Sequence, residues 1–220
     1  MRPEALPFEC IRLGGHPISA GPRTGDHLSG PAHNDVTSDL GCPVPNSLPV
    51  ELTVRSAQPT DRDPILGLVG EAFAAHFDGR EEVQIVIDTW RLNSTVPDLE
   101  LVAVEAGEVV GHVLGARGAP GSPGIVAVAP LCVSPSRQGQ GVGSALMTEL
   151  LRRAEHHGWP AIVLLGDPGY YGRFGFEPAG LLGVVYEVVG EKDPHFQIKR
   201  LSTFDPSIQG TFQYCWESSS

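Results

Sequence analysis

The chain has 220 residues, 41% of them hydrophobic and 19% charged, a composition typical of a folded protein with a sizeable core. Fifteen Lys and Arg residues stand against 26 Asp and Glu residues, so the net charge is -11 and a nucleic acid backbone would be repelled. The N-terminus lacks the apolar core of a signal peptide and no apolar run is long enough to span a bilayer. We therefore expect a cytoplasmic protein that binds neither nucleic acid nor membrane.

Residues 1–49 change between Pro, Gly and small polar residues every few positions, without an apolar stripe of either period. Such a segment buries too little apolar surface to offset its ordering entropy. We expect a disordered or non-native N-terminal extension over residues 1–49 and one domain over residues 50–220. The scattered cysteines show no CxxC spacing and are expected to be free thiols: Cys10, Cys42, Cys132 and Cys215.

The first half of the domain predicts two helices between strands. The alternating residues 51–55 (ELTVR) indicate a strand, and Thr60-Asp61 can cap a helix that starts near Arg62. A second short helix is expected from Glu81 to about Trp90. From Leu99 the period changes to two, and the segments LVAVEA and VVGHVLGA, separated by Ala-Gly-Glu, predict a β-hairpin.

The most apolar stretch, residues 125–133 (IVAVAPLCV), predicts a central strand covered on both faces. Pro130 lies inside it, and because proline cannot donate to a ladder, the strand must be bulged or splayed there. A Gly-rich loop over residues 134–144 and an amphipathic helix to about His157 follow, and Gly158 is placed to end that helix.

Shorter elements are predicted for the last third. Residues 161–165 (AIVLL) form a buried strand, followed by a helical turn around residues 170–174 and a strand from Phe176. The alternating residues 184–189 and 196–201 are expected to pair with each other as a closing hairpin.

The stretch Leu131–Ser144 (LCVSPSRQGQGVGS) joins a buried strand, a Gly-rich loop and a helix start, an order that can build an anion site. The glycines let the backbone curl so that amides point inward, beside the free amides of the first helical turn. The helix dipole contributes only about 0.3 to 1 kcal/mol, so a ligand needs further contacts. A Walker loop is excluded because the loop has no Lys, and a dinucleotide fingerprint fails at Ser144. A plain Gly-rich turn is the alternative.

The spacing Gln138-x-x-Gly141-x-Gly143 resembles the [Q/R]xxGx[G/A] motif with which GNAT acetyltransferases hold the pyrophosphate of acetyl-CoA. Residues 166–176 (GDPGYYGRFGF) resemble the end of the GNAT fold, where a Tyr stands five residues before the Phe of a Gly-Phe pair. With Pro-Ala after it, this string is similar to the YhbS-like branch. The resemblance covers about residues 51–215.

Membership in this family implies an α/β (α+β) fold, with a mixed, mostly antiparallel central sheet splayed at its fourth and fifth strands and helices on both faces. Acetyl-CoA is the implied co-substrate, no metal is needed, and the acceptor is an amine of a small molecule or protein. A homodimer is a further expectation. The implied cofactor-binding residues are Leu131, Cys132, Val133, Gln138, Gly139, Gln140, Gly141, Val142, Gly143 and Ser144.

By the same resemblance, backbone groups of Leu131 and Val133 hold the pantetheine arm while Cys132 is a bystander, since no His or Asp arrangement marks it as a nucleophile. Tyr171 is the candidate acid that protonates the departing CoA sulfur. Its alternative role is that of a packing aromatic residue beside Tyr170 and Phe174.

The general base is left open by the sequence. Some relatives place a Glu on the fourth strand, but Ala127 and Val128 stand at the corresponding place. Glu71, His76 and Asp78 are candidates on the acceptor side, although each has the pattern of an ordinary surface residue at a helix end. The missing carboxylate keeps a second class of function open, a catalytically degenerate GNAT domain that binds acyl-CoA as a sensor or scaffold.

Overall fold

A computed structural model describes residues 51–77 and 79–219 of the chain, so the expected extension over residues 1–49 lies outside the described residues. The described domain is built on a seven-stranded sheet in the order β1-β2-β3-β4-β5-β8-β6. Its strands are β1 (Thr53–Ser56), β2 (Thr95–Glu105), β3 (Glu108–Arg117), β4 (Val126–Val133), β5 (Ala161–Leu165), β6 (Glu177–Pro178) and β8 (Phe196–Arg200).

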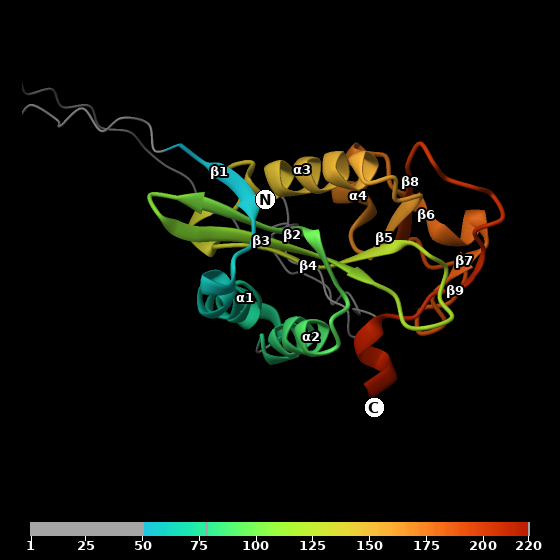
Figure 1. Cartoon of the computed structure of the whole chain (residues 1–220), viewed down its shortest axis with the longest axis horizontal. Coiled ribbons are helices and arrows are strands. Elements are labelled where there is room, and N and C mark those ends of the chain that lie inside the picture. Colours follow the sequence, from blue (N-terminus) through green and yellow to red (C-terminus); the bar gives the residue numbers. More distant parts are fainter. Residues whose placement is uncertain (1–50, 78, 220) are drawn as a thin grey trace, which may run out of the picture. The chain divides into compact units, whose positions relative to one another are not determined.

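Helices cover both faces of this sheet (Figure 1). On one face lie α1 (Arg62–Phe77) and α2 (Arg80–Arg91), and on the other lie α3 (Val142–His156) and the short α4 (Pro168–Tyr171). The β1-β2-β3-β4 half is antiparallel and only the β4–β5 pair within the sheet is parallel. The mixed, mostly antiparallel sheet with helices on both faces confirms the predicted fold class.

The apolar stripe predicted for the first helix is the face that α1 buries. It packs with Val86 of α2 on the sheet residues Val102, Leu114 and Cys132. The buried members of the stripe are Ile65, Leu68, Val69, Ala72 and Phe73. The helix hairpin is therefore attached to the sheet by the residues that helical spacing selects.

The predicted β2–β3 hairpin is confirmed, although β2 begins at Thr95 rather than at Leu99. Ala106 and Gly107 have φ angles of 51° and 84°, the positive values that a two-residue type I′ turn requires. Such a turn matches the right-handed twist of the strands, so it fixes the register of the longest pairing in the sheet.

The predicted irregularity at Pro130 is also confirmed. Opposite β3, the register shifts between Val113, which pairs with Leu131, and Gly115, which pairs with Val128, so β4 carries one extra residue at Ala129-Pro130. The parallel ladder between β4 and β5 consists of Val126↔Ile162 and Ala127↔Val163. Beyond these pairs the two strands separate, as expected for the fourth and fifth strands.

The predicted closing hairpin over residues 184–189 and 196–201 is wrong. Strand β7 (Val184–Val185) pairs in parallel with β9 (Gly210–Thr211) in a separate two-stranded sheet. Strand β8 instead lies between β5 and β6, antiparallel to both (Figure 1). The alternation identified strands correctly but not their partners, because five ladder pairs to β5 and burial of Phe196 and Ile198 favour the long-range pairing.

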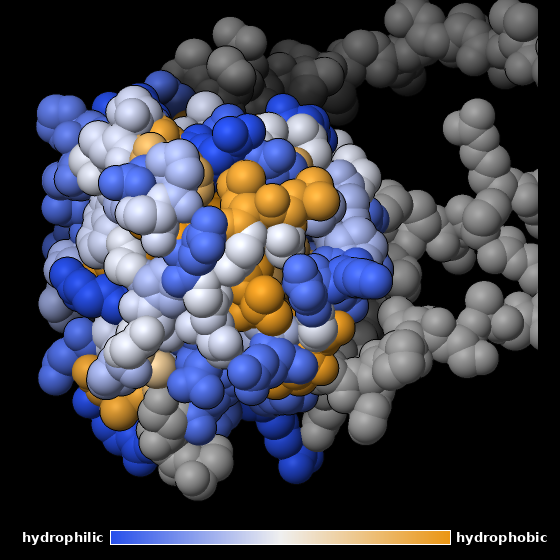
Figure 2. Space-filling model, turned by 90° about the vertical axis from the view of Figure 1, so that its right-hand side faces the viewer, coloured by the Kyte–Doolittle hydropathy of each residue, from blue (hydrophilic) through white to orange (hydrophobic). Residues whose placement is uncertain are grey.

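The end of the domain that carries these last strands shows a group of hydrophobic side chains on its surface (Figure 2). From the same stretch, Leu181 and Val188 are 75% and 60% exposed. None of the helices within the described residues has the length and apolarity needed to cross a membrane.

Candidate active site

The Gly-rich loop after β4 has the backbone conformation that an anion site needs. Gly139 and Gly141 have φ angles of 71° and 88°, in the left-handed region that favours glycine, and Gly141 is the N-cap of α3. A Cβ atom built on either residue would meet no other atom within 4 Å. The loop thus has room above its backbone for a bulky ligand such as a pyrophosphate.

The first turn of α3 supplies hydrogen-bond donors to the same place. The first bond one turn into the helix runs from the Ala145 amide to the Gly141 carbonyl. The amides of Val142, Gly143 and Ser144 have no carbonyl one turn earlier to bond to, as at every helix start. These amides and the positive end of the helix dipole favour a bound anion.

Two of the predicted cofactor residues act on the loop itself. The Gln138 side-chain amide donates to the Val133 carbonyl at 3.1 Å, so it ties the loop to the end of β4. Gln140 donates to the Ser136 carbonyl at 2.9 Å and accepts from Arg137 at 2.7 Å. These bonds hold the loop backbone in its curled form.

Arg173 was not singled out from the sequence, yet the structure brings it to this loop. It comes from the 3₁₀ turn after α4, and its guanidinium donates to the Ser144 hydroxyl at 3.2 Å. The guanidinium carbon also lies 4.0 Å from the centre of the Tyr170 ring. An exposed cation therefore stands beside the first turn of α3, where the motif had predicted a diphosphate. Its signal in the sequence is its place within residues 166–176, the string that resembles the end of the GNAT fold.

Tyr171 lies at the end of α4, which starts at an Asp167 cap whose carboxylate accepts from the Gly169 amide at 2.6 Å. Its side chain is 3% exposed and its ring packs edge-on against Phe176 with centroids 5.8 Å apart. The five-residue spacing has a physical meaning, because the turn between the two residues brings Phe176 back onto Tyr171. The packing function and a catalytic function of this ring are compatible.

The gap between β4 and β5 leaves one backbone edge of β4 without a strand partner. Leu131, Cys132 and Val133 are buried and pair with β3 on their other edge. The Cys132 side chain belongs to the cluster beneath α1 and α2. The geometry thus offers the free edge of β4, rather than the thiol, to an extended ligand arm.

Ala127 and Val128, which stand where some relatives carry a Glu, are both buried apolar residues. Glu71 is exposed on α1, while the His76 side chain and Asp78 lie outside the described residues. Glu82, which is only 1% exposed, was not identified from the sequence. Helical spacing could have identified it, because it continues the buried stripe of α2 that contains Ile85, Val86 and Thr89.

Comparisons with known proteins agree on one family. The sequence profile of the Acetyltransferase (GNAT) family matches residues 69–176. The uncharacterized N-acetyltransferases YjhQ and YhbS of Escherichia coli (strain K12) are 36% identical over 106 residues and 38% identical over 85 residues. These alignments cover 46% and 39% of the chain, and 59% and 49% of the two relatives.

Two crystal structures resemble most of the chain. One is YhbS from Escherichia coli in complex with CoA, with a TM-score of 0.69 and 28% identity over 80% of this chain and 96% of that chain. The other is a GNAT family acetyltransferase from Brucella melitensis in complex with acetyl-CoA, with a TM-score of 0.60 and 29% identity over 74% and 96%. The chain belongs to the GNAT family.

The likeness to YhbS in both sequence and structure also confirms the YhbS-like branch of the GNAT family. The matched segment spans about half the length of the curated relatives. Within the described residues of this GNAT domain, no group of three or more His, Cys, Asp or Glu side chains could hold a metal ion.

Proposed function

We propose that the chain is an acyl-CoA-dependent N-acetyltransferase, which transfers an acetyl group from acetyl-CoA to a primary amine of a small molecule or a protein. The observation that carries this proposal is the open left-handed loop at Gly139 and Gly141, joined to the amides of α3 in a GNAT domain. The cytoplasmic location and the homodimer stay predictions.

The loop and the first turn of α3 bind the pyrophosphate, and Arg173 adds a positive charge beside Ser144. The unpaired edge of β4, from Leu131 to Val133, holds the pantetheine arm by backbone hydrogen bonds. The two solved relatives support a cofactor site of this kind, because YhbS was crystallised with CoA and the Brucella melitensis acetyltransferase with acetyl-CoA.

The reaction is a direct attack. The neutral amine nitrogen forms a bond to the thioester carbonyl carbon, a backbone N–H of β4 near Val133 stabilises the oxygen, and the C–S bond then breaks. Tyr171 gives its proton to the departing sulfur, and the proton that the attacking nitrogen loses on forming the amide restores the Tyr171 hydroxyl, directly or through water. The amine must first lose a proton, because its ordinary pKa of about 10.4 keeps it charged at neutral pH.

The alternative is a degenerate GNAT domain that senses or scaffolds acyl-CoA. The absence of a carboxylate at Ala127 and Val128 favours it, because the expected base is missing from β4. It shares the cofactor site with the leading proposal and differs only in turnover.

Release of free thiol from acetyl-CoA separates the two functions. The full chain is incubated with acetyl-CoA and a mixture of primary amines, and CoA thiol is followed by its reaction with a chromogenic disulfide. An amine-dependent rise, lost in Tyr171→Phe, supports the transferase. Tight calorimetric binding of acetyl-CoA without thiol release from a broad set of amines would support the sensor.

A further inference from the structure

A cavity of about 430 Å³ lies between the first turn of α1, the end of α2 and β2. None of its lining residues belongs to the predicted cofactor set, and Glu100 at its base is on β2, two strands away from β4. The volume is within the range of about 300 to 1,000 Å³ that small-molecule sites occupy.

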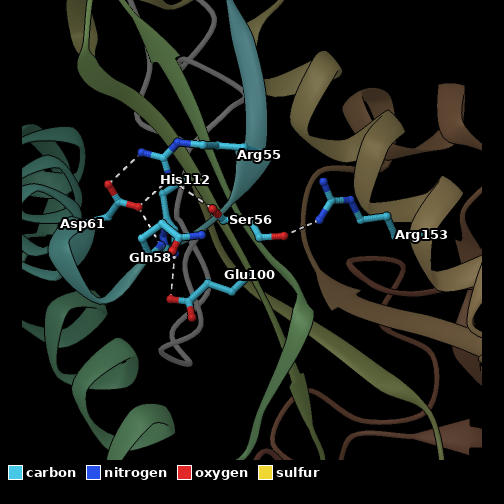
Figure 3. A network of polar contacts seen from close by, with 7 residues as sticks. All are labelled: Arg55, Ser56, Gln58, Asp61, Glu100, His112 and Arg153. Atoms are coloured by element: carbon cyan, nitrogen blue, oxygen red, sulfur yellow. Dashed lines mark hydrogen bonds and ion pairs between the residues drawn. The ribbon is translucent and has the colours of Figure 1, made fainter.

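The cavity contains one carboxylate that the surrounding side chains hold in place. The Oε1 atom of Glu100 accepts from the Trp90 indole N–H at 2.8 Å. The same atom lies 3.3 Å from Nε2 of His112 (Figure 3). Both contacts use the same oxygen, and Oε2 has no hydrogen bond to any residue in the described part of the chain. The side chain is 13% exposed, so it keeps contact with the cavity.

His112 contacts Glu100 from the interior of the domain. It is fully buried on β3, and its Nδ1 atom has no hydrogen-bond partner among residues 51–77 and 79–219. The nearby Asp61 is committed elsewhere: it pairs with Arg55 at 2.6 Å and accepts from the Gln58 amide at 2.7 Å (Figure 3). Glu100 is therefore the carboxylate that is available to a ligand in the cavity.

Two cations line the same cavity. The Arg62 guanidinium lies 5.0 Å from the centre of the Trp90 ring, and Arg117 donates to the Thr95 carbonyl at 3.2 Å. Neither forms an ion pair with a carboxylate of the described residues. The Thr95 hydroxyl is buried and likewise has no partner there. In a chain of net charge -11, the cavity has two guanidinium groups and one carboxylate.

We propose that this cavity binds a small amino acid that has a free ammonium group, a carboxylate and an apolar side chain. The ammonium group binds Oε2 of Glu100. The ligand carboxylate accepts from Arg62 and Arg117, since guanidinium groups match carboxylates in geometry and charge. The apolar side chain packs on Trp90 and Ile65.

The chemistry of the cavity favours this class over simpler ions. A ligand with only an amine would leave both guanidinium groups without a carboxylate partner. A ligand with only a carboxylate would leave the Glu100 carboxylate beside another anion. A ligand with both charges pairs each group in the cavity with an opposite charge, and a buried polar group that finds a partner no longer carries its desolvation cost.

Calorimetry on the full chain without acetyl-CoA tests the proposal. The probes are L-leucine, L-methionine and L-phenylalanine, together with 3-methylbutylamine and 4-methylpentanoate, which each retain one charged group of leucine. We expect at least one amino acid to bind, and each single-charge analogue to bind at least about tenfold more weakly. Absence of binding by all three amino acids up to about 10 mM overturns the proposal.

Variants assign the binding to the cavity. Glu100→Gln keeps an oxygen for Trp90 but removes the charge, and Arg117→Gln removes one guanidinium group at the rim. Each is expected to weaken amino-acid binding at least about tenfold. Glu108→Gln and Arg152→Gln, at exposed sites outside the cavity, are the matched controls. Unchanged affinity in folded Arg117→Gln and Glu100→Gln variants contradicts the proposal. Because acetyl-CoA is absent, that result would leave the transferase proposal standing.

Discussion

Tyr171 depends on its immediate neighbours for its position. Its ring meets Tyr170 edge-on with centroids 4.8 Å apart, Phe176 on another side, and the backbone of Gly166 on a third. A buried ring held this closely loses little entropy when it acts, and that is the property a catalytic side chain needs.

Tyr171→Phe keeps the ring and its packing and removes only the hydroxyl group. We expect kcat to fall by roughly 10- to 1,000-fold, since general acid catalysis contributes about 10²- to 10⁴-fold and water substitutes in part. The acetyl-CoA affinity should change little. Steady-state kinetics and a melting curve measure both, and wild-type turnover in the folded variant would refute the role.

Gly166→Ala tests the position of the Tyr171 ring by changing a neighbouring residue and not the ring itself. A Cβ atom on Gly166 would lie 2.4 Å from Cε2 of Tyr171, so the ring must move. We expect turnover to fall while acetyl-CoA still binds. Gly172→Ala is the control, because its Cβ meets no atom within 4 Å and its φ of -56° suits any residue. Equal turnover in the two variants would show that the ring position does not matter.

At the scale of elements, α3 contributes to the candidate site with its N-terminus and to the core with one face. Its N-terminus faces the Gly-rich loop, while its buried face packs on β2, β3 and β4. Next to this face lies the half-buried Glu149, whose carboxylate accepts from both Arg152 and Arg153. Arg153 donates in turn to the Ser56 hydroxyl of β1 at 2.6 Å (Figure 3).

Gly141→Asp places a carboxylate at the N-cap of α3, where the phosphates are expected. We predict at least about a tenfold loss of acetyl-CoA affinity by calorimetry, from charge repulsion at the predicted phosphate site. Gly141→Asn is the matched control, because Asn tolerates the left-handed conformation and has the same shape without the charge. If the two variants bind acetyl-CoA equally well, the cofactor site is not at this loop.

Glu149 makes stability depend on pH. Hydrogen bonds from Arg152 and then Arg153 lower its pKa to about 2 from its ordinary 4.5, against the opposing effect of burial. Since the folded-state pKa is depressed, its stabilisation is complete above about pH 4.5 and is lost as the pH falls toward 2. Glu149→Gln should destabilise by about 1 kcal/mol at pH 7.

Urea denaturation of wild type and Glu149→Gln across this pH range measures the effect. The difference in unfolding free energy should shrink as the pH falls through the window. A difference that stays constant with pH would mean that the ion pairs add nothing beyond the packing of α3. Glu108→Gln, at an exposed position on the hairpin, controls for a general charge effect.

At the scale of the whole molecule, the described domain contains every residue that the proposed site uses. The first strand begins at Thr53, and the predicted extension over residues 1–49 precedes it. Its aperiodic Pro- and Gly-rich composition remains the argument that it lies outside the core.

Deleting residues 1–49 should leave the melting temperature and the acetyl-CoA affinity nearly unchanged. Differential scanning calorimetry and isothermal titration on the shortened chain test this. A fall of many degrees, or a marked change in affinity, would place part of the extension against the domain and move its boundary.

Local pattern was enough for most elements and for the candidate loop. The bounds of β5 agree with the prediction and α1 starts at the predicted residue. Helix α2 lies within one residue of its prediction at each end, and α3 ends one residue before its predicted end. Helical and strand periods, turn glycines and the QxxGxG spacing are properties of neighbours in the sequence, so they can be read without the fold. The irregularity at Pro130 follows in the same way, from one missing N–H group.

Pairing over long distances was decided only by the folded chain. The alternation of apolar and polar residues predicts a strand over residues 196–201. It does not show whether that strand pairs with β5 or with residues 184–189. Arg173 reaches Ser144 across 29 positions of the chain, and Glu100 meets Trp90 and His112 across 10 and 12 positions. Such contacts depend on which surfaces bury each other best, a property of the whole domain that no short window of sequence contains.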